Sequence, residues 1–349
     1  MKVVMDEKIP YLREALLQMG MEVVALPGVA ICRADVSDAD ALFVRTRTLC
    51  GKDLLEGSHV KFIGTATIGH DHIDSTYCAD NGILWCNAAG CNADAVLQYV
   101  QSVVYQWALE RGRSLAGLSM GVVGVGEIGG RVAAWAESAG MVVLKNDPPK
   151  AASGRCGYVS LDEIAAKSDI ITFHPSLVRT GDYPSYHLAG ADFFASLGRC
   201  SLLINASRGP VVDNAALFAY MCSNPSVDVV LDVWEGEPHI DMSLLDKTFI
   251  STPHIAGYSA EGKMNATRMV LEAFVSFIGY RGAVPQLALP APDVPVVSAN
   301  NRQEALLRIY SPVDDSRELK ENPSAFEELR NNYRLRREPS AYTINIVRE

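Results

Sequence analysis

The feature that most constrains the fold is a run of three glycines, Gly124, Gly126 and Gly129, between an apolar segment and a helix-forming one. Residues 120–123 (MGVV) predict a buried strand, and residues 128–139 predict a helix. The first glycine permits a tight turn, the second lets a ligand approach the backbone, and the third lets the helix lie close to the strand. The pattern predicts a strand–turn–helix unit whose helix N-terminus faces an anion.

The residue Asp147 sharpens this prediction because it ends the next apolar run, 18 positions after Gly129 (147 − 129). Glycines and acidic residue together match the fingerprint of a Rossmann dinucleotide-binding domain. We expect the three glycines, with Glu127 and Ile128 at the helix start, to contact the pyrophosphate. The Asp147 carboxylate can bind both ribose hydroxyls and would repel a 2′-phosphate, so it favours NAD over NADP. A glycine-rich turn without a ligand is the competing interpretation.

Composition narrows the class of protein. The 349 residues are enough for two or three domains, and 48% hydrophobic with 21% charged residues is typical of a globular protein. A net charge of −10 argues against nucleic-acid binding, and no apolar run approaches the roughly 20 residues that span a membrane. The N-terminus lacks a signal-peptide pattern, and eight cysteines without a CxxC pair suit reduced thiols. We therefore expect a cytoplasmic protein with a small-molecule partner.

The order of apolar segments predicts an α/β fold with two doubly wound parallel sheets. In the first block, the expected strands are residues 2–5, 21–25, 41–45, 62–65 and 83–86. In the second block, they are residues 120–123, 141–145, 170–173, 201–205, 227–232 and 249–251. Long helices at 93–110 and 260–278 would lead to the second block and back to the first. The expected domains are 1–92 with 258–285, and 93–257.

The C-terminal part has a different composition. Residues 285–295 are rich in proline and predict a linker, followed by a helix-like stretch at 323–337 and a strand-like one at 342–347. We expect residues 286–349 to form a small α+β domain. A segment of this size rarely makes a stable core alone, so it would dock onto a second subunit or wrap around its own chain.

Three short segments at the ends of predicted strands carry polar chemistry: residues 205–210 (NASRGP), 232–238 (DVWEGEP) and 252–257 (TPHIAG). The carboxyl edge of an open α/β sheet is where ligands bind. In these segments the chain resembles the D-2-hydroxyacid dehydrogenases, and the resemblance covers roughly residues 1–280. It implies a catalytic set of one residue from each segment, namely Arg208, Glu237 and His254.

The residue types suit the implied chemistry. Oxidising a secondary alcohol beside a carboxylate needs a base that titrates near neutrality, a role that suits a histidine such as His254. An acid such as Glu237 would stabilise the imidazolium and raise the pKa of the histidine. The planar donors of Arg208 match a substrate carboxylate. Taken singly, a surface arginine, a solvated acid and a core histidine are the competing interpretations.

The likeness is closest to a branch of the family that acts on a phosphorylated sugar acid. Its motifs here include residues 3–10 (VVMDEKIP), 254–262 (HIAGYSAEG) and a tail segment, 329–338 (LRNNYRLRRE). The resemblance implies a homodimer formed through the tail. It also implies a substrate set of Thr46, Thr67 and Tyr258, a nicotinamide set of Ala206, Ser207, Asp232 and Gly257, and a cofactor contact at Pro175. Pro175-Ser176 replaces the usual Thr-Pro of the family.

A phosphorylated substrate needs positive charge, and Arg336-Arg337 is the densest basic pair of the tail. We hypothesise that these arginines reach the active site of a partner subunit; a solvated basic helix end is the alternative. The segment His70-Asp71-His72 has ligand chemistry, but a loop explains it and the family needs no metal, so we expect none. Two other functions compete: a dehydrogenase for another 2-hydroxy acid such as 3-phosphoglycerate, and an NAD-sensing protein that resembles transcriptional corepressors.

Overall fold

The computed structural model describes residues 1–347. They form two compact units: Met1–Asn92 with Ser259–Ala291, and Ala93–Tyr258 with Pro292–Glu349. The first unit is discontinuous, and its bounds lie within a few residues of the expected ones. The tail, by contrast, was expected to be a separate domain and instead belongs to the second unit.

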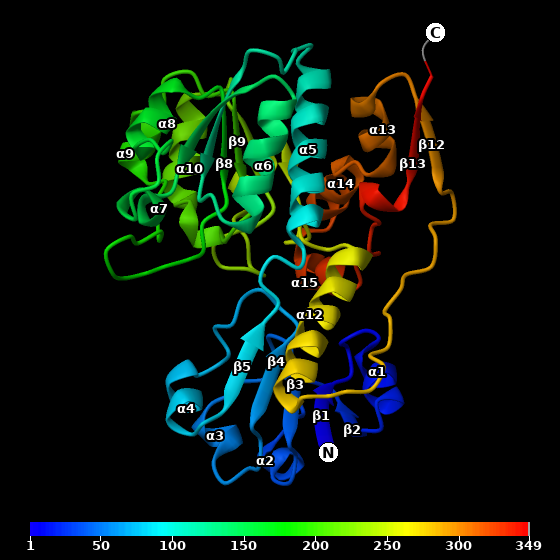
Figure 1. Cartoon of the computed structure of the whole chain (residues 1–349). Helices are drawn as coiled ribbons and strands as arrows, with labels where there is room; N and C mark the ends of the chain where they lie inside the picture. The colour runs from blue at the N-terminus through cyan, green and yellow to red at the C-terminus, as the bar shows by residue number, and fades with distance from the viewer. Residues whose placement is uncertain (348–349) are drawn as a thin grey trace. The chain divides into compact units, whose positions relative to one another are not determined.

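The first unit is a five-stranded parallel sheet of order β2-β1-β3-β4-β5 (Figure 1). Its strands are β1 (Lys2–Asp6), β2 (Glu22–Leu26), β3 (Ala41–Val44), β4 (Phe62–Thr65) and β5 (Leu84–Asn87). Its helices are α1 (Leu12–Gln18), α2 (Arg33–Val36), α3 (Lys52–Leu55), α4 (Ser75–Asp80) and α12 (Ala260–Ile278). Rings of Phe43, Phe62 and Phe274 lie 5.3 to 5.8 Å apart and join α12 to the sheet. This contact explains why a helix distant in sequence completes the unit.

The second unit is a six-stranded parallel sheet of order β11-β10-β9-β8-β6-β7. Its strands are β6 (Ser119–Val123), β7 (Val142–Asn146), β8 (Ile170–Phe173), β9 (Leu202–Asn205), β10 (Asp228–Leu231) and β11 (Ile250–Ser251). Its helices are α5 (Ala93–Glu110), α6 (Glu127–Ser138), α7 (Pro148–Ala152), α8 (Leu161–Lys167), α9 (Ala191–Ala195), η1 (Gly209–Val211), α10 (Asn214–Ser223) and α11 (Met242–Lys247). The sheets confirm the predicted doubly wound α/β class.

Strand β6 shows why these runs are apolar throughout. All five of its residues are buried, because parallel strands carry helices on both faces. Met120 and Val122 face a core shared with α5 and α6, whereas Val123 faces the opposite core with α8 and α10. The neighbours β6 and β8 have connections that leave in opposite directions, so the carboxyl edge between them is the switch point where ligands bind.

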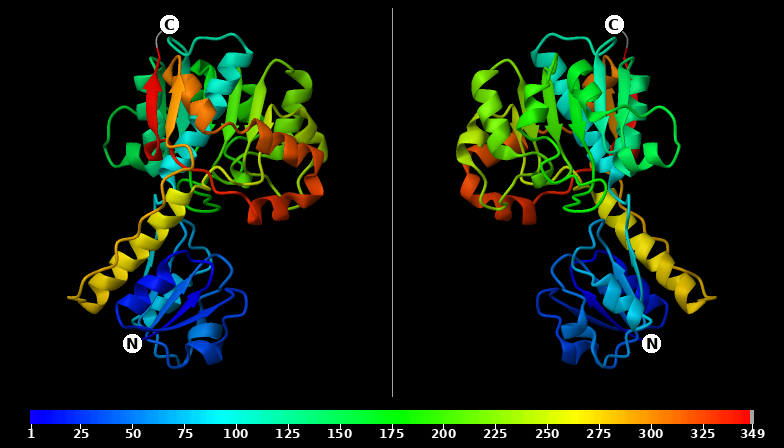
Figure 2. Two further views of the ribbon diagram at one scale, coloured as in Figure 1. Left: turned by 90° about the vertical axis from the view of Figure 1, so that its right-hand side faces the viewer. Right: turned by 90° about the vertical axis from the view of Figure 1, so that its left-hand side faces the viewer.

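The tail packs against both apolar cores of the second unit, one on each face of the six-stranded sheet. It contains β12 (Val296–Ala299), α13 (Arg302–Ile309), α14 (Val313–Glu321), η2 (Pro323–Ala325), α15 (Phe326–Asn331), η3 (Pro339–Ala341) and β13 (Thr343–Ile346). Figure 2 shows β12 beside β13, a parallel pair. Leu306 and Tyr310 enter the core of α5 and α6, and Leu319 and Phe326 enter the other core. These anchors make the tail part of the unit.

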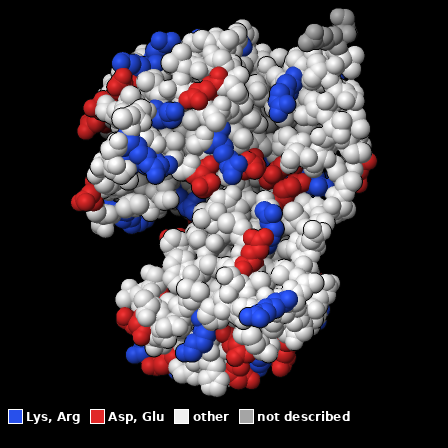
Figure 3. Space-filling view, in the orientation of Figure 1, with Lys and Arg blue, Asp and Glu red and all other residues white. Residues whose placement is uncertain are grey.

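The expected helix over 323–337 is wrong in its second half, because α15 ends at Asn331. Asparagine favours turns over helix interiors, and Asn331-Asn332 are adjacent here. Helix α13 was not predicted, although Asn301 accepts a hydrogen bond from the Glu304 backbone as an N-cap. Along the described residues, no helix is long and apolar enough to cross a membrane. On the face in Figure 3, acidic and basic side chains are interspersed.

Candidate functional site

The glycine-rich segment joins the end of β6 to the start of α6. Gly124 has φ +80°, and a Cβ there would lie 2.5 Å from the backbone nitrogen of Pro175. A Cβ on Gly129 would lie 2.0 Å from the carbonyl oxygen of Gly124. Both positions therefore require glycine. Gly126 is the N-cap of α6 and an added Cβ would meet no described atom within 4 Å, so a phosphate has room to approach its backbone.

Glu127 and Ile128 form the first turn of α6, as the expected pyrophosphate contacts require. Asp147 follows β7, and its two carboxylate oxygens accept backbone hydrogen bonds from Val125 (2.9 Å) and Lys150 (3.2 Å). A carboxylate offers about four acceptor positions, so about two are left for ribose hydroxyls. The open helix N-terminus and this acid fit the pyrophosphate and ribose of NAD.

The segment after β8 contacts the glycine-rich turn through Pro175, which lies against Gly124. The preceding residue, His174, has its Nε2 atom 2.9 Å from the hydroxyl of Thr172, while its Nδ1 atom is buried without a hydrogen-bond partner. Burial lowers the pKa of His174 to about 3, so the imidazole is neutral at physiological pH. Pro175-Ser176 stands where the family has Thr-Pro, so the residue that lies against Gly124 presents its backbone and an apolar ring.

The loops that follow β9 and β10 pack directly on each other. A Cβ on Gly209, next to Arg208, would lie 2.0 Å from the carbonyl oxygen of Trp234. The backbone nitrogen of Asn214 donates to the Glu235 carboxylate at 2.9 Å, and Asn214 accepts from the Glu235 backbone at 3.2 Å. These contacts bring the segments that carry two of the predicted catalytic residues together at the carboxyl edge of the sheet.

The strongest feature of the site is the pair formed by His254 and Glu237. The Nδ1 atom of His254 lies 2.8 Å from Oε2 of Glu237, and the side chains are 26% and 18% exposed. Because the carboxylate accepts a hydrogen bond from Nδ1–H, Nε2 is the ring nitrogen that can take a proton from a substrate. His254 has φ +58°, a strained conformation for a residue with a side chain, and such strain is concentrated at functional sites.

Glu237 is ionised in this setting. Burial favours its protonated form, but hydrogen bonds from His254 and the Trp234 backbone, together with the cation of Arg330, outweigh burial and lower its pKa. The Trp234 nitrogen donates to Oε1 at 2.8 Å, which leaves Oε2 for the imidazole. A fixed carboxylate at Nδ1 stabilises the imidazolium that forms when Nε2 takes a proton.

Asp232, expected near the nicotinamide, is buried beneath the His254 loop. Its carboxylate accepts hydrogen bonds from the Thr252 hydroxyl (2.7 Å) and from the backbone nitrogens of Ile255 (2.7 Å) and Ala256 (3.0 Å). Burial raises its pKa. The contacts show that Asp232 shapes the loop that carries His254 and continues into Gly257.

Arg208 is half-buried, and its Nη1 atom donates to the carbonyl oxygen of Ser207 at 2.8 Å. The side chain of Asn205 fixes this turn, because it accepts from the Ser207 nitrogen and hydroxyl and donates to the Arg208 carbonyl. Ala206 and Ser207 are both buried. These contacts fix the backbone at Arg208 and leave its other guanidinium N–H groups for a carboxylate.

Two of the predicted substrate residues belong to the first unit. Thr46 is exposed after β3, and Thr67 is half-buried after β4, so both lie at the carboxyl edge of that sheet. Thr67 donates to the Gly69 carbonyl (2.8 Å), so the Thr65 hydroxyl must donate to Thr67 (2.7 Å) and accept from Nε2 of His72 (2.9 Å). His72 thus orients Thr67 through Thr65, which explains this histidine without a metal.

Tyr258 ends the second unit's first segment and meets the tail. Its hydroxyl accepts a hydrogen bond from Nε of Arg330 at 3.3 Å, and its ring lies 6.2 Å from that of Tyr333. The Nη1 atom of the same arginine is 3.7 Å from Oε2 of Glu237. Arg330 was not predicted from the sequence, because the denser basic pair Arg336-Arg337 was chosen instead. The only sequence signal for Arg330 was its place in the tail segment 329–338.

The hypothesis that Arg336 binds a substrate phosphate is wrong in this structure. Its side chain is buried, and all its donors are used by Gln98, Tyr333 and three backbone carbonyls, those of Ala95, Ile255 and Ala256. No N–H group is left for a phosphate. Arg337 is half-buried beside it, and its carbonyl accepts from Gln98 at 3.1 Å. These contacts fit the alternative interpretation, in which the tail wraps around its own chain.

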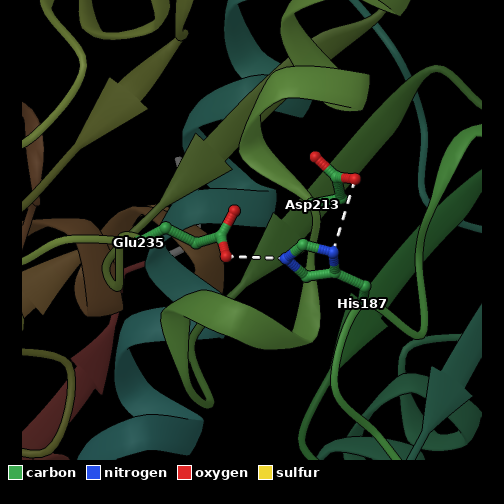
Figure 4. Close-up of side chains that lie close together, drawn as sticks. All are labelled: His187, Asp213 and Glu235. Carbon is green, nitrogen blue, oxygen red and sulfur yellow. Dashed lines mark hydrogen bonds and ion pairs between the residues drawn. The ribbon is translucent and has the colours of Figure 1, made fainter.

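A second cluster with ligand chemistry consists of His187, Asp213 and Glu235 (Figure 4). Nε2 of His187 is 2.7 Å from Glu235, and its Nδ1 is 3.4 Å from Asp213. The two carboxylates thus lie at different ring nitrogens, and each also accepts a backbone N–H, from Asn214 and Ala216. These hydrogen bonds hold the loops after β9 and β10 together.

Comparisons with known proteins agree with this geometry. The family model described as D-isomer specific 2-hydroxyacid dehydrogenase, NAD binding domain, matches residues 92–256. Erythronate-4-phosphate dehydrogenase of Bacteroides thetaiotaomicron is 48% identical over 345 residues, 99% of each chain. The enzyme of the same name from Citrobacter koseri is 43% identical over 98% of this chain and 93% of its own. The likeness therefore includes the tail.

Solved structures share the fold of most of the chain. NAD-bound 3-phosphoglycerate dehydrogenase of Entamoeba histolytica has a TM-score of 0.66 at 22% identity, covering 80% of this chain and 96% of its own. D-lactate dehydrogenase of Aquifex aeolicus, complexed with NAD and lactic acid, has a TM-score of 0.61 at 23% identity, covering 80% and 96%. The chain thus belongs to the D-isomer specific 2-hydroxyacid dehydrogenase family, in the group of the erythronate-4-phosphate dehydrogenases.

Proposed function

We propose that this protein oxidises 4-phospho-D-erythronate to 2-oxo-3-hydroxy-4-phosphobutanoate with NAD, a step of pyridoxal 5′-phosphate biosynthesis. The observation that carries the proposal is the likeness to erythronate-4-phosphate dehydrogenases over 98–100% of this chain, tail included. The His254–Glu237 pair supplies the acid–base chemistry that such an oxidation needs.

The mechanism follows from the orientation of the pair. Nδ1 of His254 is committed to Glu237, so Nε2 takes the proton of the substrate's C2 hydroxyl as hydride leaves C2. The glycine-rich turn and Asp147 would hold NAD, which would supply the acceptor for that hydride. The carboxylate of Glu237 stabilises the imidazolium until the proton leaves to solvent. The balance is one alcohol oxidised to a ketone, with one hydride and one proton released.

Substrate orientation falls to the remaining residues. Arg208 would hold the substrate carboxylate with its planar donors and polarise the C2 oxygen. Thr46, Thr67 and Tyr258 would bind the hydroxyl and carboxylate oxygens, because each carries a hydroxyl group able to donate or accept. Their hydroxyls complete the set that we assign to the substrate.

NADH formation with four acids tests the proposal: 4-phosphoerythronate, erythronate, 3-phosphoglycerate and D-lactate. We expect kcat/KM to favour the first by at least about 100-fold, since a site built for a polar group rejects analogues that lack it. His254→Gln should lower kcat by about 100-fold to 10,000-fold, the usual contribution of a general base. A preference for 3-phosphoglycerate would replace the proposed substrate. NAD binding without turnover of any acid would favour an NAD-sensing protein.

The partner and compartment belong to the same proposal. We propose a homodimer formed through the tail, supported by the apolar surface of its two-stranded sheet, where Val296 and Ile346 are 46% and 44% exposed. Replacing both with lysine should yield monomers in sedimentation, whereas an unchanged mass would exclude this surface.

None of the eight cysteines, all within the described residues, forms a disulfide, which suits the cytoplasm.

A further inference from the structure

The tail places a cation on the catalytic carboxylate. Arg330 lies on α15, outside the stretch that the NAD-binding family model matches, and its Nη1 atom is 3.7 Å from Oε2 of Glu237. That oxygen is the one that accepts from Nδ1 of His254 at 2.8 Å. The guanidinium and the imidazole therefore share one carboxylate oxygen.

The arginine is held in this position by packing and by a second contact. Its neighbours Phe326 and Leu329 belong to or pack against the apolar core beside β8 and β9, which fixes α15 on the unit. Nε of Arg330 donates to the Tyr258 hydroxyl at 3.3 Å. The side chain is 33% exposed, so its charge is only partly screened by water.

We propose that Arg330 is a positioning residue for the reaction: it holds Glu237 against His254 and shares the charge of that carboxylate with the imidazole. Only the kinetic test of this inference rests on the proposed function. Two carboxylates act on His254 here, those of Glu237 and the buried Asp232, and the positive charge of Arg330 offsets the first. Tyr258 contributes a neutral hydroxyl to the same group.

The sign of the effect follows from electrostatics. With Arg330 present, the negative charge of Glu237 is shared between two cations, so the imidazolium is stabilised less. Without it, Glu237 stabilises the imidazolium more strongly, and His254 holds its proton to higher pH. Oxidation needs a neutral His254, so the acidic limb of the kcat/KM profile should move to higher pH.

The experiment compares Arg330→Met, Arg330→Lys and Arg334→Met in the full-length protein. Arg334 is an exposed arginine of the same tail and serves as the matched control. We expect the acidic limb with 4-phosphoerythronate to rise by about half a pH unit or more in Arg330→Met, to return most of the way in Arg330→Lys, and to stay unchanged in Arg334→Met. Unchanged NAD affinity will show that each variant is folded.

A proton NMR titration of the His254 ring gives the same readout without turnover, with the resonance assigned by its loss in His254→Gln. It tests the inference even if the proposed substrate is wrong. A higher titration midpoint in Arg330→Met supports the role. An unchanged midpoint overturns it, and so does a rise in KM alone, because that result would make Arg330 a substrate-binding residue.

Discussion

Arg336 is the residue whose replacement the structure predicts most sharply. The residue is 8% exposed, and its guanidinium donates to Gln98 and to the carbonyls of Ala95 and Ile255 at 3.0 Å each, and also to the Ala256 carbonyl. Arg336→Met keeps much of the side-chain volume but removes every one of these donors. We expect a loss of stability with no specific loss of substrate affinity.

The magnitude follows from the groups left behind. A buried acceptor without a partner costs about 1–3 kcal/mol, and removal of one member of a buried charged network costs about 3–5 kcal/mol in all. The half-buried Asp315, whose pKa is raised by desolvation, would also lose its nearby cation. At about 2–4 °C per kcal/mol for a unit of 150–250 residues, Tm should fall by about 6–20 °C.

Thermal unfolding followed by tryptophan fluorescence measures this change. Three of the four tryptophans, Trp107, Trp135 and Trp234, lie in the second unit and Trp85 lies in the first, so most of the signal reports the unit that contains Arg336. Arg334→Met, an exposed change in the same tail, should stay within about 0.5 kcal/mol of the parent. A loss below about 1 kcal/mol in Arg336→Met, or an unchanged Tm with a tenfold rise in KM, would refute the reasoning.

Three further predictions test separate parts of the fold. Gly129→Ala places a Cβ 2.0 Å from the Gly124 carbonyl, so calorimetry should show NAD affinity lower by about tenfold or more; equal affinity would contradict the close contact. His174 has a folded pKa of about 3 against an unfolded value of about 6.5, so the unfolded chain binds the extra proton and stability falls as pH drops between those values. In urea unfolding, the free energy of unfolding of His174→Gln should depend less on pH. An unchanged slope would show that other groups cause the pH dependence. Thr65→Val interrupts the hydrogen bonds that orient Thr67, so KM for the acid should rise while NAD affinity holds; a fall in NAD affinity alone would contradict the assignment.

Much of the fold could be predicted because its signals are local. Helix α5 and helix α12 have the expected bounds, since long amphipathic periodicity identifies a helix without knowledge of its partners. The glycine-rich turn was predicted for a similar reason: Gly124 has the positive φ that a tight strand-to-helix turn demands. The sequence could not show that α15 ends at Asn331, because short helices depend on packing more than on periodicity.

The sequence by itself determined the parallel α/β class, the dinucleotide fingerprint and the three loops that carry Arg208, Glu237 and His254, since each depends on residues close together in the chain. The tertiary structure decided the roles of the tail arginines. Arg330 contacts Glu237, and Arg336 is buried among carbonyls from positions 80 or more residues away. Charge density along the chain cannot distinguish them, because the free energy of a charged group is set by the partners that folding brings to it.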